Sequence, residues 1–402
     1  MKIRLREMKS LQTVLLCLLI TWSVVSFNVF AFLQIVSYLV LGLCLLGFLV
    51  MLGLCMQRPA MSRLDALVTA YFMVLIVVTL LNGTAIKDCI YMSITVFLLL
   101  LTLNYFSSGF DVTLKVCAAV FSVIIYANLA IMVMFPDWMF EAEDTFYSYL
   151  LGGNYNQMGG RMLCGIVTNI LCLRFSRAWL INVIPLIVVS MLTLLLVGSM
   201  TSTFCMLLFI LFCLVPSKRL QKTGLIMFFV FYLLFQFIVC FSGEGLQNNP
   251  VAVYIVEDVL GKDMSFTYRT TMWDAAGKMF AESPLWGYGW VDTEWYLANL
   301  SSLAIGPHNF IYSILINGGL ILMALFIGIC FETLKRASSS RLDRLYIILL
   351  IGIQTWLFMG TMEVYPVFFF VYLVMLAYYY PTLKYNDANR DATETVDSDA
   401  RV

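Results

Sequence analysis

Residues 261–320, GKDMSFTYRTTMWDAAGKMFAESPLWGYGWVDTEWYLANLSSLAIGPHNFIYSILINGGL, form the longest hydrophilic interruption in an otherwise apolar chain. They contain the only histidine, His308, together with Arg269 and Lys278. The sequence on both sides has the composition of membrane-spanning helices. A loop that carries cations and turn residues on such a scaffold indicates a site for an anionic, lipid-linked substrate.

The composition predicts an all-α polytopic membrane protein. Of the 402 residues, 62% are hydrophobic and 12% are charged, whereas soluble domains are about 25% charged. The apolar residues occur in runs of about 20, which suffice to cross a bilayer core as helices. Helices are favoured because lipid satisfies no backbone hydrogen bond. The net charge of +0 is uninformative about partners.

We expect twelve membrane spans in a single integral membrane domain over residues 1–385. Extracytoplasmic loops are predicted at about 136–157 and 242–308, and the polar tail 386–402 is expected to be disordered and cytoplasmic. The predicted spans cover residues 11–29, 33–55, 64–82, 89–106, 113–135, 156–174, 178–197, 201–215, 223–241, 309–333, 344–361 and 364–381.

The distribution of basic residues predicts the orientation of these spans. With the N-terminus inside, 19 of the 24 Lys and Arg residues fall in cytoplasmic segments and the remaining five fall outside. Such an excess on the cytoplasmic side is typical of polytopic membrane proteins. Both termini are therefore expected to be cytoplasmic, and both long loops are expected on the outer face.

No cofactor, metal site or nucleic-acid partner is expected. The eleven cysteines lie mostly within apolar runs and show no CxxC spacing, and a single histidine cannot form a histidine cluster. Buried cysteine usually behaves as a small hydrophobic residue. Glycine-rich phosphate loops of the kind found in soluble proteins and nucleic-acid motifs are both lacking.

Within the second loop, residues 272–280 have apolar side chains at helical spacing, with Asp274 and Lys278 on the other side. This pattern predicts an amphipathic helix that ends before Pro284. Such a helix either lies in the membrane surface or packs as an ordinary loop helix. Further on, Gly287 and Gly289 are either turn glycines or positions where the backbone approaches a substrate.

Three side chains are the main candidates for chemistry. His308 precedes an apolar span, and imidazole exchanges a proton near neutral pH; the alternative is a polar residue at a helix start. The Arg269 guanidinium could bind a phosphate in bidentate fashion, or extend from the surface towards lipid headgroups. Arg161 begins an apolar span, where an ionisable group is a functional candidate, unless it extends to the outer surface.

Several motifs in this order resemble the O-antigen ligase and polymerase superfamily of bacterial envelope glycan assembly. They are Arg269 with Trp273, then the run SPLWGYG at 283–289, then His308-Asn309 followed by Gly318-Gly319-Leu320. The upstream run GGNYNQMGG at 152–160 is similar to the outside-loop asparagine motif of that family. One position departs from the family pattern: Met200 stands where the family often has an arginine, and Arg161 is a candidate for supplying that charge.

The resemblance implies a GT-C-like, metal-independent glycosyltransferase in the bacterial cytoplasmic membrane. It also implies an undecaprenyl-diphosphate-linked glycan as donor, a sugar acceptor, surrounding membrane lipids, and the flippase and chain-length regulator of the same pathway as partners. His308, as general base, and Arg269 are then the expected catalytic residues. The expected substrate-binding residues are Arg161, Asn154, Asn156, Asn309, Lys278 and Gly287.

Three functions remain open at this level. A polymerase would join lipid-linked repeat units into an exopolysaccharide, capsule or O-antigen chain. A ligase would perform the same chemistry but transfer the glycan to lipid A core or another envelope acceptor. A transporter or flippase would form no bond, and would be expected to carry charged or broken helices near the bilayer midplane. The polymerase is the reading we favour.

Overall fold

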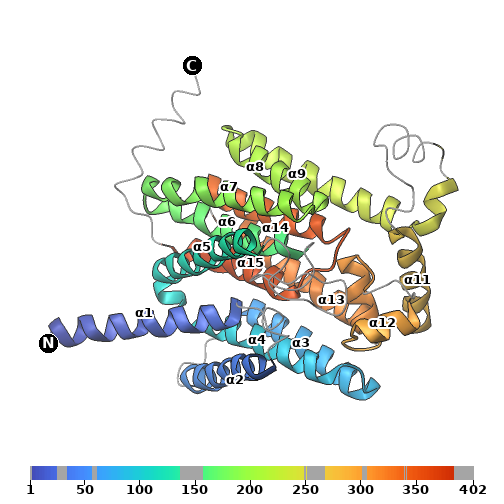
Figure 1. Ribbon diagram of the computed structural model, residues 1–402, viewed down its shortest axis with the longest axis horizontal. Coiled ribbons are helices and arrows are strands. Elements are labelled where there is room, and N and C mark those ends of the chain that lie inside the picture. The colour runs from blue at the N-terminus through green and yellow to red at the C-terminus, as the bar shows by residue number, and fades with distance from the viewer. Residues whose placement is uncertain are drawn as a thin grey trace.

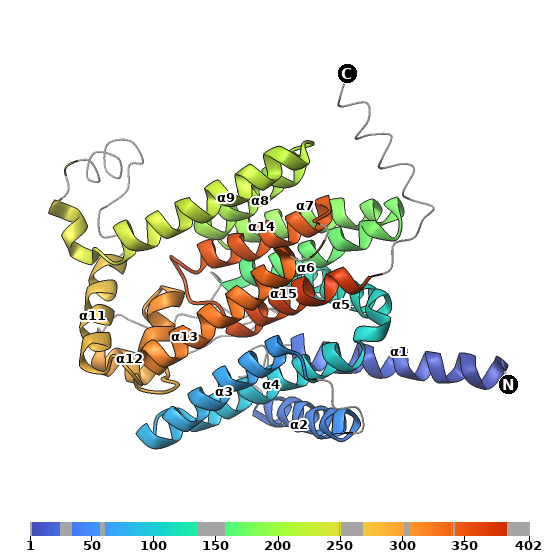
Figure 2. The same cartoon turned by 180° about the vertical axis from the view of Figure 1, so that it is seen from behind.

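The computed structural model describes residues 2–24, 34–56, 61–135, 157–248, 250, 268–300, 306–338, 340 and 342–383. Within these residues the fold is all-helical, without a strand (Figures 1 and 2). The helices are α1 (Lys2–Val24), α2 (Gln34–Met56), α3 (Arg63–Asn82), α4 (Ile86–Tyr105), α5 (Phe110–Met134), α6 (Met158–Leu171), α7 (Leu180–Leu196), α8 (Met200–Leu214), α9 (Lys218–Leu234), α11 (Arg269–Glu282), α12 (Thr293–Asn299), α13 (Phe310–Ser338), α14 (Arg344–Met359) and α15 (Val367–Tyr379).

Each of the twelve predicted spans coincides with a helix, but twelve membrane crossings are not confirmed. Seven helices in the described part are long and apolar enough to cross a membrane: α2, α3, α4, α5, α7, α9 and α13. By contrast, α6, α8, α14 and α15 have 14, 15, 16 and 13 residues, whereas a span needs about 20. The apolar runs that predicted these four spans form short helices of the bundle.

The centre of the bundle is formed by α6, α14 and α15. Every residue of α6 is buried, as is nearly every residue of α15. The outer helices α2, α7 and α9 instead expose large apolar side chains such as Leu39, Ile181 and Met227. This distribution is the one expected when lipid surrounds the outer helices. The apolar helices and their exposed faces identify an integral membrane protein.

Basic side chains gather at one end of the bundle. Arg174 lies 3.2 Å from Asp343 and donates a 3.0 Å hydrogen bond to the Leu383 carbonyl. Arg344 donates to the carbonyls of Cys213 and Val215 at 2.8 and 3.1 Å. The short helices α11 and α12 lie at the opposite end, away from the start of α1 (Figure 1).

The helix predicted over residues 272–280 is part of α11, which ends before Pro284. Its apolar face, including Met272, Trp273 and Met279, is buried in a cluster with Tyr312 of α13. The helix therefore packs as a loop helix against the bundle. The loop predicted at about 136–157 lies outside the described residues except for Gln157, and the tail 386–402 lies wholly outside them.

A break in α13 gives the SPLWGYG run its structural role. Gly318 and Gly319 have non-helical backbone angles, and the run packs against them. The backbone N–H groups of Tyr288 and Gly289 donate to the Ile316 and Asn317 carbonyls at 2.8 and 2.9 Å, and Leu320 N–H donates to the Pro284 carbonyl at 2.8 Å. These bonds satisfy backbone groups that the break would otherwise leave without partners.

Gly319→Ala is expected to destabilise the protein by about 3 kcal/mol or more, because Gly319 combines a Gly-only backbone region with a close contact. Its φ is 58° and its ψ is −153°, and an added Cβ would lie 2.4 Å from the Leu285 carbonyl carbon. Thermal unfolding of the purified protein in detergent measures the effect. Gly328→Ala is the matched control on the same helix, since its added Cβ would lie 3.4 Å from Leu67. Equal melting temperatures for the two variants would contradict this account of the break.

Candidate active site

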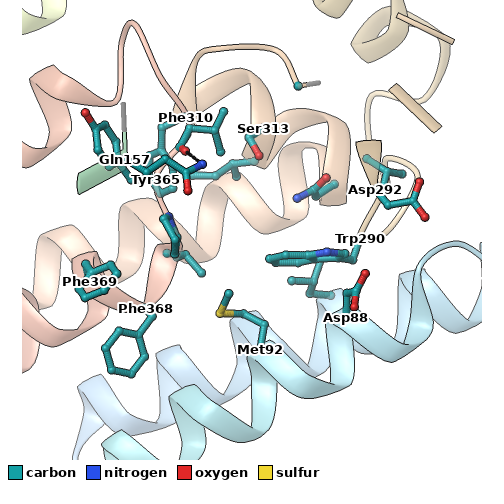
Figure 3. A pocket seen from close by; sticks show the side chains of 18 of the residues that line it. Asp88, Met92, Gln157, Trp290, Asp292, Phe310, Ser313, Tyr365, Phe368 and Phe369 are labelled. Carbon is teal, nitrogen blue, oxygen red and sulfur yellow. Dashed lines mark hydrogen bonds between the residues drawn. The ribbon is translucent and has the colours of Figure 1, made fainter. Parts of the chain in front are cut away.

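A cavity of about 360 Å³ lies among the starts of α4, α6, α13 and α15, at the end of the bundle that carries α11 and α12. Its wall combines apolar side chains from several helices with a small set of polar and ionisable groups (Figure 3). Its size falls in the range of small-molecule sites, about 300–1,000 Å³. The polar and ionisable residues of the wall include Asp88, Gln157, Arg161, Asp292, His308, Asn317 and Glu363.

At this cavity, His308 is paired with Glu363. The imidazole Nδ1 lies 3.1 and 3.2 Å from the two carboxylate oxygens, and the side chains are only 13% and 6% exposed. His308 also has a φ of 44°, a left-handed conformation that is unfavourable for a residue with a Cβ. Strain of this kind persists only where the surrounding structure fixes it. Here Phe310, two residues after His308, begins α13 and its N–H donates a 2.7 Å hydrogen bond to the Gly360 carbonyl.

Arg269 contacts the same carboxylate. Its Nη2 lies 3.9 Å from Glu363 Oε2, the oxygen that is 3.2 Å from His308 Nδ1. Its Nε donates a 2.8 Å hydrogen bond to the Met362 carbonyl. Arg269 is not among the residues that line the cavity in the described structure. Arg269 and His308 therefore lie close together, and both contact the carboxylate of Glu363.

Arg161 is a buried cation on the cavity wall. Arg161 is only 3% exposed, and its guanidinium lies 5.5 Å from the Phe369 ring centroid. Among the residues that the structure describes, neither Nε nor Nη2 has a hydrogen-bond partner. An uncompensated buried charge costs several kcal/mol. Binding an anion in the cavity would offset that cost.

Two glycines allow α6 to place Arg161 there. A Cβ on Gly159 would lie 2.4 Å from Ser202 Cβ, and one on Gly160 would lie 2.6 Å from the ring of Tyr365. The Ser202 and Tyr365 hydroxyls are themselves hydrogen-bonded at 3.0 Å. Burial raises the pKa of the Tyr365 hydroxyl, so it stays protonated near neutral pH.

Asn309 holds the backbone next to His308 and does not line the cavity. Its Oδ1 accepts from Tyr312 N–H at 3.0 Å, which caps the start of α13. Its Nδ2 donates to Gln236 Oε1 at 3.0 Å and to the Thr361 carbonyl at 3.1 Å. Gln236 belongs to a π-helical turn, Phe235–Cys240, that continues α9; such turns often occur at functional sites.

The other predicted substrate-binding residues lie elsewhere. Lys278 is exposed on α11, and Gly287 packs against the break in α13, where an added Cβ would lie 2.3 Å from the Ile316 carbonyl oxygen. Neither lines the cavity. Asn154 and Asn156 lie outside the described residues. Met200, at the position where the related motif has an arginine, is 70% exposed and does not line the cavity either.

Reading the sequence alone missed Glu363, although a signal was present. It is the only acidic residue between Asp343 and Asp387, in a run that is otherwise strongly apolar. An ionisable group inside such a run is a functional candidate. Asp88, Asp292 and Trp290, which also line the cavity, carried no comparable signal because each lies in an ordinary loop or helix-start context.

This arrangement can move a proton and bind an anion at one place. Because Glu363 holds Nδ1 of His308, Nε2 is the ring nitrogen left for proton transfer. Within the described residues, no group of three or more His, Cys, Asp or Glu side chains could hold a metal ion. The chemistry available to these side chains is acid–base catalysis beside a buried guanidinium.

Comparison with known proteins matches the segment that carries part of this site. Residues 185–327 match the family model described as O-antigen ligase, and this range contains Arg269, Trp290, His308 and Asn309. No curated protein and no solved structure matches the chain. The resemblance carried by the sequence motifs is thereby confirmed: the segment at residues 185–327 matches the O-antigen ligase family.

Proposed function

We propose that this membrane protein is a polymerase that joins undecaprenyl-diphosphate-linked oligosaccharide repeat units at the outer face of the cytoplasmic membrane. The product would be an exopolysaccharide, capsule or O-antigen chain. The observation that carries the proposal is that the buried Arg161 guanidinium and the His308–Glu363 pair line one cavity. A lipid-linked glycan diphosphate and an acceptor hydroxyl need these two functions side by side.

In the proposed reaction, Arg161 binds the diphosphate of the donor. The acceptor hydroxyl gives its proton to His308 Nε2 as its oxygen forms a bond to the anomeric carbon of the donor sugar. The bond between that carbon and the diphosphate oxygen breaks, and the lipid diphosphate leaves with the electron pair. Arg161 stabilises the negative charge that develops on the leaving group.

The remaining polar contacts orient the base. Glu363 fixes the imidazole through Nδ1 and stabilises the imidazolium that forms during transfer. Arg269 and the Met362 carbonyl hold the segment that carries Glu363. In this proposal Asn309 acts by capping α13, and Arg269 acts through the carboxylate. Asn154, Asn156 and Lys278 stay predicted contacts for more distant sugars.

The cavity wall also supports a lipid-linked donor. Phe368 and Phe369 of α15 and Met92 of α4 form an apolar side near Tyr365 (Figure 3). The polyprenyl chain that is attached to the diphosphate would contact such side chains rather than water. The donor would be delivered by a flippase and the product length set by a regulator of the same pathway.

A ligase is the second candidate, because the matching family model is described as O-antigen ligase. The donor, the general base and the cation would be unchanged, and only the acceptor would differ. Lipid A core or another envelope acceptor would then enter the cavity in place of a growing chain. The acceptor is chosen by the shape of the site and not by the catalytic residues.

Deleting the gene in its host is expected to leave single repeat units on the lipid carrier, because a polymerase is the step that extends them. Glycan extracted from the membrane and separated by size measures the result, and wild-type protein supplied from a plasmid serves as the control. Long chains accumulating on the carrier would establish the ligase instead. Carrier-linked units trapped on the inner face would refute both and favour the transporter, whereas normal chains in the deletion strain would refute all three functions.

A further inference from the structure

The cavity has a second polar region, around Trp290. Figure 3 shows the carboxylates of Asp88 and Asp292 beside the Trp290 ring, on the side of the cavity away from Gln157 and Phe369. Asp88 stands in the first turn of α4. Asp292 caps α12, accepting from Trp295 N–H at 2.8 Å through Oδ1. The proposed diphosphate site does not use this region.

The backbone holds Trp290 in a fixed position. Its N–H donates to Thr79 Oγ1 at 2.8 Å, and its carbonyl accepts from Ala85 N–H at 3.1 Å. The preceding Gly289 has a φ of 80°, and an added Cβ would lie 2.5 Å from Thr79 Cα. The Trp290 backbone is thus anchored on the last turn of α3 and on Ala85 before α4, and its ring offers a flat apolar surface at the cavity.

The polar atoms around this ring are hydrogen-bond acceptors. The exposed side chains of Asp88 and Asp292 contribute carboxylate oxygens, and Asn317 lines the cavity with a buried Oδ1 that has no partner among the described residues. Hydroxyl groups of Thr293 and Ser313 line the same cavity. The neighbouring cation, Lys87, lies 5.6 Å from the Tyr38 ring centroid on α2. Arg161, whose buried Nε and Nη2 have no hydrogen-bond partner among the described residues, independently marks the same cavity as a ligand site.

A sugar ring matches this set of groups. One of its faces is lined with C–H groups and can lie on an indole, and its hydroxyls can donate to carboxylate and amide oxygens. A ring that carries its own carboxylate would instead meet two like charges, which is unfavourable at short range. A ring that carries an ammonium group would be attracted.

We propose that the Trp290 region is the acceptor-sugar subsite, and that it accepts a neutral or amino sugar and rejects an acidic one. The inference rests on the proposed function, because only a transferase needs an acceptor beside the diphosphate. It assigns the two ends of one cavity to ligand groups of different charge. The anionic diphosphate binds at Arg161, and the hydroxyl-rich acceptor binds at Asp88 and Asp292. In this respect it goes beyond the family match, which names no sugar.

Ligand-observed NMR with the purified full-length protein tests this inference without requiring turnover. The probes are methyl β-glucoside, methyl β-glucosaminide and methyl β-glucuronide, which differ in charge on the same ring. We expect the two non-acidic probes to bind at least about tenfold more tightly than the glucuronide, the fold-change that one interaction with a charged group supplies. Asp88→Asn combined with Asp292→Asn should bring the glucoside and the glucuronide within about threefold of each other.

Two further variants test whether the Trp290 ring is the surface on which the sugar binds. Trp290→Ala should abolish binding of all three probes, while Trp290→Phe should retain weaker binding with the same charge preference. Arg177→Ala, at an exposed position that does not line the cavity, should bind the probes as wild type does. Because the assay needs no turnover, a failure of catalysis and a failure of this subsite give separate results. The inference is overturned if wild type binds no probe at millimolar concentration, binds the glucuronide as tightly as the glucoside, or keeps its preference in the double aspartate variant.

Discussion

Glycan transfer is expected to fall by about 10²–10⁴-fold when His308 is replaced by alanine, the usual contribution of a general base. No second histidine exists in the chain to take over the proton. The measurement is single-turnover transfer in membrane vesicles, using lipid-linked glycan extracted from the deletion strain as donor. His308→Gln keeps a polar side chain of similar length but cannot act as a base, so it should be nearly as inactive.

The pairing with Glu363 gives this prediction a sharper form. Glu363→Gln preserves the shape of the side chain but removes the charge that stabilises the imidazolium, and should lower transfer substantially by itself. Residues that act as one unit are strongly non-additive. The variant with both His308→Ala and Glu363→Gln should therefore be no less active than His308→Ala alone. Fully multiplicative losses would show that the two side chains act independently, and unchanged chain elongation in His308→Ala would refute the assigned base.

Replacing Arg161 should have opposite effects on activity and on stability. Arg161→Met removes the cation that binds the departing diphosphate, and should lower kcat/KM by about 10²–10³-fold. It also removes a buried charge whose Nε and Nη2 have no partner in the described structure, so the empty protein should melt at a higher temperature than wild type. Transfer assays and thermal unfolding in detergent measure the two effects.

Further variants separate the charge of Arg161 from its shape. Arg161→Lys should recover part of the activity, because a point charge replaces a bidentate one. Inorganic pyrophosphate should raise the melting temperature of wild type but not of Arg161→Met, since a ligand stabilises only the protein that binds it. Arg177→Ala, which changes an exposed arginine between α6 and α7, is the control and should match wild type in both assays. A melting temperature for Arg161→Met below that of wild type would contradict the claim that the Arg161 charge destabilises the empty protein.

The helices were predictable from the sequence because each apolar run of the chain became one helix. The twelve predicted membrane crossings are not confirmed, because helices such as α15 are shorter than a membrane span and have nearly all of their residues buried in the bundle. Among the site residues, His308 and Arg269 were predicted from their motif, and both contact the carboxylate of Glu363. Their partner Glu363 is 55 residues from His308 in sequence, and no local pattern reports a contact of that range.

Two predicted roles differ from what the geometry favours, for the same physical reason. Asn309 was expected to bind substrate, but its polar atoms cap α13 and hold Gln236 and Thr361. Gly287 was a candidate for close approach to substrate, but what it approaches is the backbone of α13. A motif shows that a residue type is required without showing whether the requirement comes from a ligand or from the fold.

The run from Pro284 to Trp290 links the two halves of the chain by hydrogen bonds on both of its edges. One edge of it is hydrogen-bonded to the backbone of α13, and the other is hydrogen-bonded to Thr79 in the last turn of α3 and to Ala85 just before α4. Sliding α3 past α13 would break main-chain bonds along both edges at once. We therefore expect the N-terminal and C-terminal helices to move together at this end of the molecule, so that the entry of a ligand into the cavity depends on other segments.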